Sequence, residues 1–272
     1  MGQNDKEQSQ ENSGYNQLTR NFRLMDDDFM TLVFGGNIEA TQLLLRIILD
    51  DPELIVTKTT GQFEIKNSNG RSVRLDIHAV DSKGENFDVE IQRADRGAGA
   101  ERARLNSSLL DTKMAKKGEK IPRLKPAYVI FITENDVLGG GFPVYHIKRT
   151  IDEMDHAYFG DGSHIIYVNN AYSDESTEIG KLMHDFRCTS ASDMYFDVLA
   201  DRVRYFKETE GGRAQVCKMV EDLTRESAVL ASIEAWREDD IPEAEILRRI
   251  MSKYDLNRTE ADAYMAKSRK SA

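Results

Sequence analysis

The chain has 272 residues, of which 40% are hydrophobic and 31% are charged, and its formal net charge is −10 at pH 7. This composition is typical of a folded globular protein, and no apolar run reaches the roughly 18 residues that a transmembrane helix needs. The acidic balance, taken alone, argues against a strongly nucleic-acid-binding protein. The two cysteines, Cys188 and Cys217, are too far apart in sequence to suggest a metal-binding pair or a disulfide framework, so we expect a reducing, cytoplasmic setting without a membrane.

The N-terminal half predicts one helical region, three strands and a second helix. Residues 1–20 are rich in Gln, Asn, Ser and Glu, which predicts a disordered tail. Helical spacing of apolar residues predicts a helix over about 28–49, interrupted at "GGN". The stretch "LIVTKTTGQFEIK" predicts a strand, and 73–92 predicts a hairpin of two amphipathic strands. A helix over about 98–117 follows.

The remaining chain predicts two buried strands and then helices. "AYVIFIT" and "HIIYVNN" are apolar enough for central strands, with a loop at "GGGFP" and a short helix or turn at "IKRTIDEMD" between them. Helices are expected at 176–186, 193–208, 214–238, 242–254 and 257–268, the last with Thr259 as a candidate cap. We therefore expect a mixed α/β core at 21–212 and a helical C-terminal extension at 213–272.

The hairpin concentrates acidic residues on one face. The loop "SKG" pairs Asp81 with Glu85, so Asp76 faces Glu90 in the same register. One face is then apolar throughout, and the other carries Arg74, Asp76, His78, Asp88, Glu90 and Gln92. Opposed carboxylates share either a proton or a cation. Their oxygens suit Mg²⁺ or Mn²⁺, although a solvated polar strand face neutralised by Arg74 is an alternative interpretation.

The order of helix, strand, strand with Asp, turn, strand with Glu-x-Gln and helix resembles the PD-(D/E)XK nuclease superfamily. It is most similar to the bacterial family of recombination-promoting nucleases and transposases, and "KKGEKIPRLKPAYVIFIT" and "FGDGSHIIYVNN" share in the likeness. The resemblance implies a restriction-endonuclease-like core and a Mg²⁺- or Mn²⁺-dependent DNA endonuclease. It also implies that Asp76 and Glu90 hold the metal, and that Gln92 acts where the wider superfamily has Lys.

Further site residues are expected from the flanking helices. Glu39 is the candidate for a third metal ligand from the first helix, with Asp28 as the alternative, and Arg74 faces Gln92 and is a candidate for the missing positive charge. Residues 93–125 contain ten basic and four acidic side chains, a net charge of +6, and such a stretch can contact DNA phosphates. The predicted DNA-contacting residues are Arg74, Arg93, Arg102, Asn106, Lys116 and Lys117.

Two other functions stay open at this point. A catalytically degenerate DNA-binding or protein-interaction protein on the same fold would agree with the acidic charge and with Gln92 in place of Lys. A structural adaptor would use only the C-terminal helices, which could also support a homodimer. The adjacent pair His184 and Asp185 predicts a core or capping role, because neighbouring helical residues do not face each other, and Trp236 is expected to pack among the terminal helices.

Overall fold

The computed structural model describes residues 19–65, 73–115 and 124–269. The chain divides into two compact units, Met1–Arg213 and Ala214–Ala272. The sequence predicts its boundary between core and extension after Gly212. The predicted N-terminal tail lies almost entirely outside the described residues.

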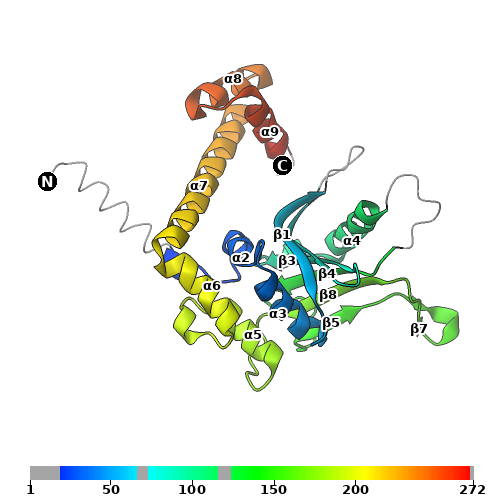
Figure 1. Ribbon diagram of the computed structural model, residues 1–272. Helices are drawn as coiled ribbons and strands as arrows, with labels where there is room; N and C mark the ends of the chain where they lie inside the picture. The colour runs from blue at the N-terminus through cyan, green and yellow to red at the C-terminus, as the bar shows by residue number, and fades with distance from the viewer. Residues whose placement is uncertain (1–18, 66–72, 116–123, 270–272) are drawn as a thin grey trace. The chain divides into compact units, whose positions relative to one another are not determined.

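A six-stranded mixed sheet forms the centre of the first unit (Figure 1), with the order β1-β2-β3-β4-β8-β5. The pairs β3–β4 and β4–β8 are parallel, and the other three pairs are antiparallel. The strands of this sheet are β1 Val56–Ile65, β2 Val73–Asp81, β3 Asn86–Gln92, β4 Ala127–Thr133, β5 Val144–Ile147 and β8 Ser163–Asn169. A two-stranded sheet pairs β6 Thr150–Ile151 with β7 Ala157–Tyr158. The restriction-endonuclease-like α/β fold expected from the sequence is thereby confirmed.

The predicted central strands are confirmed. β4 begins and ends where the apolar run does, and it lies between two parallel neighbours, where strands are covered on both faces. The edge strand β5 and the small sheet β6–β7 were not expected, because "GGGFP" and "IKRTIDEMD" have the local composition of a loop and a turn. β5 is recruited by pairing with β8, which is a long-range contact.

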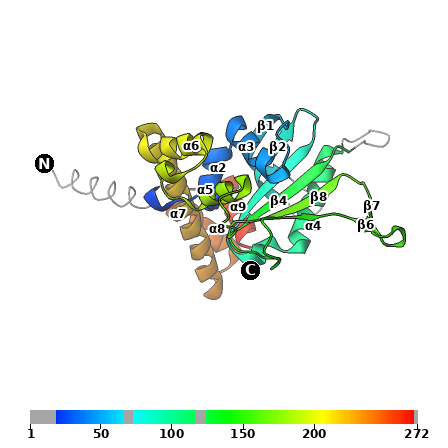
Figure 2. The same cartoon turned by 90° about the horizontal axis from the view of Figure 1, so that it is seen from below.

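Helices lie on both sides of this sheet, with α4 on one side and α2, α3 and α5 on the other (Figure 2). The first-unit helices are α2 Asp27–Phe34, α3 Ile38–Leu49, α4 Ala100–Met114, α5 Glu178–Arg187 and α6 Asp197–Glu208, with 3-10 turns η1 Asp95–Ala98, η2 Asp152–Met154 and η3 Ala191–Asp193. The expected interruption of the first helix is confirmed. Gly36 takes a positive φ of 72°, and the Asn37 side chain then caps α3 by accepting from the Ala40 backbone N–H.

The second unit contains most of α7 (Glu210–Glu238), together with α8 (Glu243–Tyr254) and α9 (Arg258–Ser268). Its core is a cluster of apolar side chains, against which Trp236 packs as expected: Val229, Ile233, Ile246, Leu247, Ile250, Leu256, Ala261 and Met265. The cap of α9 is Asn257 and not Thr259, because Asn257 and Glu260 form a reciprocal capping box. Within the described residues, no single helix has the length and apolarity to cross a membrane, and α2 and α3 reach them only when joined across a 111° bend.

Candidate active site at the end of the hairpin

The β2–β3 hairpin has the register that the sequence predicts, since Ile77 pairs with Val89 and His78 with Asp88. Beyond the Ile77–Val89 pair, the two strands are joined by hydrogen bonds between backbone N–H groups and side-chain carboxylates. The Asp76 backbone N–H donates to Glu90 Oε1 at 3.3 Å, and the Ile91 backbone N–H donates to Asp76 Oδ2 at 3.1 Å. The two carboxylates therefore lie between the ends of the strands, each bound to the backbone of the opposite strand.

The polar face of the hairpin is buried, so the interpretation as a solvated strand face is wrong. Asp76 is 8% exposed, and Asp88 and Glu90 are fully buried. Helix α4 covers Asp88 and Glu90, and from this helix Asn106 Nδ2 donates to Asp88 Oδ2 at 3.2 Å. Burying several carboxyls together is costly unless they are protonated, paired or bound to a cation.

The expected separation of apolar and polar faces does not hold along the whole hairpin. Gln62 of β1, between residues paired with Ile77 and Leu75, has a positive φ of 49°, which interrupts the alternation of side chains. Leu75 packs with Leu109 and Leu110 of α4, the helix that also covers the carboxyls. The core therefore extends to both faces of the sheet at this point.

Burial and mutual repulsion raise the pKa values of these carboxyls. The pKa of Asp76 rises to about 8, first because it is buried and then because Glu90 and Asp27 are near. Burial also raises the pKa of Glu90, against the opposing effect of Arg102. The pKa of Asp88 is raised well above its usual value by burial and by Glu90. With a pKa of about 8, Asp76 is mostly protonated at neutral pH in the absence of a metal ion.

Arg102 of α4 is the cation that contacts the site. Its Nη2 donates to Glu90 Oε2 at 2.6 Å, and its Nη1 donates to Gln92 Oε1 at 2.8 Å and to the Gly97 carbonyl at 3.2 Å. Gly97 leaves the space that Gln92 occupies, because a Cβ at residue 97 would lie 2.0–2.2 Å from the Gln92 amide atoms. The sequence indicated Arg74 for this charge, but Arg74 is exposed and its charge acts on Asp27.

Asp27, in the first turn of α2, is the acidic residue that a helix brings to Asp76. Burial raises the pKa of Asp27, whereas Arg74 and a hydrogen bond to Asp76 lower it. The predicted ligand Glu39 is instead exposed in the first turn of α3, and Asp28 accepts from Gln62 Nε2 at 3.4 Å. The sequence offered no way to choose within "MDDDF", because acidic residues are common at helix N-termini for electrostatic reasons alone.

The predicted DNA-contacting residues occupy different environments. Arg93 is 55% exposed but pairs with Asp26 at 2.7 Å and with Glu134 at 3.2 Å. Asn106 is 1% exposed, so its assignment to DNA contact is corrected to a buried partner of Asp88. Arg102 belongs to the carboxylate site. Lys116 and Lys117 lie outside the described residues.

Asp185 has the structural role that the sequence predicts, although His184 and Asp185 do approach each other, with 3.4 Å between His184 Nδ1 and Asp185 Oδ1. Asp185 is fully buried and accepts hydrogen bonds from the backbone N–H groups of Tyr195 at 2.8 Å and Phe196 at 3.0 Å. Phe196 is the N-cap of α6, so this carboxyl ties α5 to the start of the next helix.

Comparison with known proteins gives one family. Residues 29–182 match the family model described as "PD-(D/E)XK nuclease family transposase". No curated protein and no solved structure matches the chain significantly. The matched range includes Asp76, Glu90, Gln92 and Arg102, whereas Asp27 lies two residues before it.

Proposed function

We propose that this chain, which belongs to the PD-(D/E)XK nuclease family transposases, is a divalent-metal-dependent endonuclease that hydrolyses phosphodiester bonds in DNA. The observation that carries the proposal is the pair of buried carboxyls Asp76 and Glu90, with Asp27 beside Asp76 and with Arg102 joining Glu90 to Gln92. A link to recombination or mobile DNA follows from the family description alone and is part of the proposal.

The residues present fit a hard divalent cation. Three carboxyls from two separate segments converge, and their oxygens are the ligands that Mg²⁺ and Mn²⁺ prefer. The pKa of Asp76 rises to about 8 first because the carboxyl is buried and then because Glu90 and Asp27 are near, and a bound cation would oppose both effects. Asp76 and Glu90 would hold the ion, with Asp27 as the third carboxyl. When bound, such an ion lowers the pKa of water and balances charge that builds on a phosphate.

In the wider superfamily a lysine supplies a positive charge at the reacting groups. Here Arg102 supplies that charge, and Gln92 supplies a hydrogen-bonding amide. The Arg102 guanidinium places a permanent charge within 3 Å of both the Glu90 and the Gln92 side chains. By accepting from Arg102, the Gln92 carbonyl oxygen is fixed, and this orients the amide for a water or a phosphate oxygen. The basic side chains nearby would contact the DNA backbone, with Arg93 exchanging its acidic partners for phosphate.

The contacts of Glu90 also favour a second candidate, a DNA-binding protein that no longer cleaves. Both Glu90 oxygens are engaged, Oε1 by the Asp76 backbone and Oε2 by Arg102. A metal at Glu90 must therefore compete with Arg102 for the carboxylate, and where Arg102 keeps its place Glu90 holds no metal. The fold would then serve DNA binding or protein interaction only.

Cleavage of supercoiled plasmid tests the two candidates. Purified protein is incubated with Mg²⁺, Mn²⁺ or EDTA, and nicked and linear products are measured for the wild type, Asp76→Asn and Glu90→Gln. Metal-dependent cleavage that both substitutions abolish supports the nuclease. Salt-dependent DNA binding without cleavage, unchanged by Asp76→Asn, supports the non-catalytic protein.

A matched pair of variants tests the helix-borne ligand. Asp27→Asn should reduce cleavage by at least about tenfold, because it removes a carboxyl beside Asp76. Glu39→Gln changes an equally acidic residue in the first turn of the next helix and should leave cleavage unchanged. If Glu39→Gln reduces cleavage and Asp27→Asn does not, the third metal ligand is Glu39 and not Asp27.

A further inference from the structure

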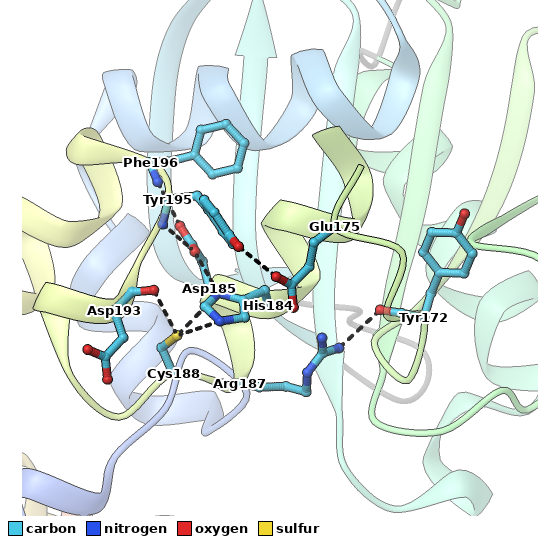
Figure 3. Close-up of polar contacts among 9 residues, drawn as sticks. All are labelled: Tyr172, Glu175, His184, Asp185, Arg187, Cys188, Asp193, Tyr195 and Phe196. Atoms are coloured by element: carbon cyan, nitrogen blue, oxygen red, sulfur yellow. Dashed lines mark hydrogen bonds and ion pairs between the residues drawn. The ribbon is translucent and has the colours of Figure 1, made fainter. Parts of the chain in front are cut away.

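A second cluster of potential metal ligands lies at the C-terminal end of α5 (Figure 3), and it shares no residue with the carboxylate site on β2 and β3. It consists of His184, Asp185 and Cys188, whose ligand atoms all lie within 4.8 Å of one another. His184 and Cys188 are four residues apart, so one turn of helix brings them together.

The spacing of these atoms matches the edges of a tetrahedral metal site. His184 Nδ1 lies 3.4 Å from Cys188 Sγ and 3.4 Å from Asp185 Oδ1. Tetrahedral zinc, with bonds of about 2.3 Å to sulfur and about 2.0–2.1 Å to nitrogen and oxygen, sets its S···N edge at about 3.5 Å and its N···O edge at about 3.4 Å. Two of the three edges therefore already have the length that a zinc site needs, and the third, between Cys188 Sγ and Asp185 Oδ1, lies within 4.8 Å.

The surroundings hold the ligands in place. Asp185 is fixed by the backbone N–H groups of Tyr195 and Phe196. The Tyr195 ring packs edge-on against the His184 imidazole, with 4.8 Å between centroids, and its hydroxyl donates to Glu175 at 2.6 Å. Partners that orient a ligand in this way are usual around protein metal sites.

One side of the cluster is open to solvent. The His184 side chain is 27% exposed, whereas Asp185 is fully buried, so a fourth ligand such as water can approach.

We propose that His184, Asp185 and Cys188 form a binding site for a borderline-soft divalent cation of the zinc class, separate from the carboxylate site. The mixed nitrogen, oxygen and sulfur donors select zinc over magnesium, because magnesium prefers oxygen ligands alone. All three ligands come from the end of α5 and its C-cap, and the hydrogen bonds of Asp185 connect this site to the segment that leads into α6. Binding displaces the thiol proton of Cys188, which passes to the solvent.

Optical titration with Co²⁺ tests this site without any measurement of DNA cleavage. The full-length protein is stripped with EDTA, dialysed, and titrated in excess Mg²⁺, which occupies oxygen-only sites. The wild type should bind one Co²⁺ with a sulfur-to-cobalt charge-transfer band in the near ultraviolet. Zn²⁺ should displace this ion and raise the melting temperature.

Variants assign the signal to the cluster. Cys188→Ser should abolish the band, and His184→Gln should weaken Zn²⁺ binding by more than about 100-fold, since even partners of ligands contribute 10- to 100-fold. Cys217→Ser removes the other free cysteine, in α7, and should leave the band and the affinity intact. Absence of the band in the wild type, or its persistence in Cys188→Ser, would overturn the proposal. Both results are independent of nuclease activity, so the two proposals can fail separately.

Discussion

Replacing Arg102 with Met removes the guanidinium while keeping a long, flexible side chain on α4. In the structure, Arg102 bridges the fully buried Glu90 and the Gln92 amide at 2.6 Å and 2.8 Å. The variant leaves Glu90 without the Arg102 guanidinium, so the pKa of Glu90 should rise further. We expect stability to fall because a contact is lost, and cleavage to fall because a charge is lost at the reacting phosphate.

The loss of stability follows from the contact that is removed. Hydrogen bonds to charged groups contribute about 1.5–3 kcal/mol, and the 43% exposure of the Arg102 side chain reduces that value through screening. A cost of about 1–3 kcal/mol corresponds to a decrease in melting temperature of roughly 3–9 °C for a unit of this size. The loss of a preorganised charge at a reacting phosphate typically reduces turnover by about 100- to 1,000-fold.

Thermal unfolding by circular dichroism and plasmid cleavage measure the two effects separately. Arg104→Met is the matched control, because Arg104 lies on the same helix and is exposed. Arg102→Lys retains the charge but loses the two-pronged contact, and it should recover part of the cleavage. If Arg102→Met cleaves DNA as the wild type does, Arg102 does not substitute for the missing lysine.

Three further predictions concern the site and the helical unit. Gly97→Ala should reduce cleavage with little loss of stability, because its Cβ would displace the Gln92 amide, and a variant with full activity would show that the position of Gln92 is unimportant. The metal-free protein should lose stability as the pH rises from about 4 to about 8: the Asp76 pKa is higher in the folded state than its unfolded value of 3.8, so the folded state holds the proton more tightly. Thermal melts in EDTA at pH 5 and pH 8 should show this loss of stability, and added Mg²⁺ should oppose the loss. In Asp76→Asn the pH dependence should be smaller. An equal pH dependence in that variant would exclude Asp76 as its source. Asn257→Ala breaks the capping box of α9 and should destabilise the C-terminal unit by about 1 kcal/mol in thermal or denaturant unfolding, whereas an unchanged transition would contradict the capping role.

Local patterns in the sequence were enough to predict most of the elements and the core of the site. The apolar run of β4, the interruption at Gly36 and the register of the hairpin depend on neighbouring residues, and each is confirmed. Because the register follows from the turn, the approach of Asp76 to Glu90 is a consequence of the local sequence alone.

Tertiary structure decided which residues join that pair. Asp27 and Arg102 come from α2 and α4; nothing in the local sequence distinguishes Asp27 from Asp28, and the sequence predicts Arg102 only as a DNA contact. Burial was also decided at this level, since packing of the helices on the sheet buries Asp76, Asp88 and Glu90, and burial is the main cause of the Asp76 pKa of about 8. Strand pairing and turn chemistry are encoded within a few residues, whereas the packing of a helix across a sheet depends on contacts distant in the chain.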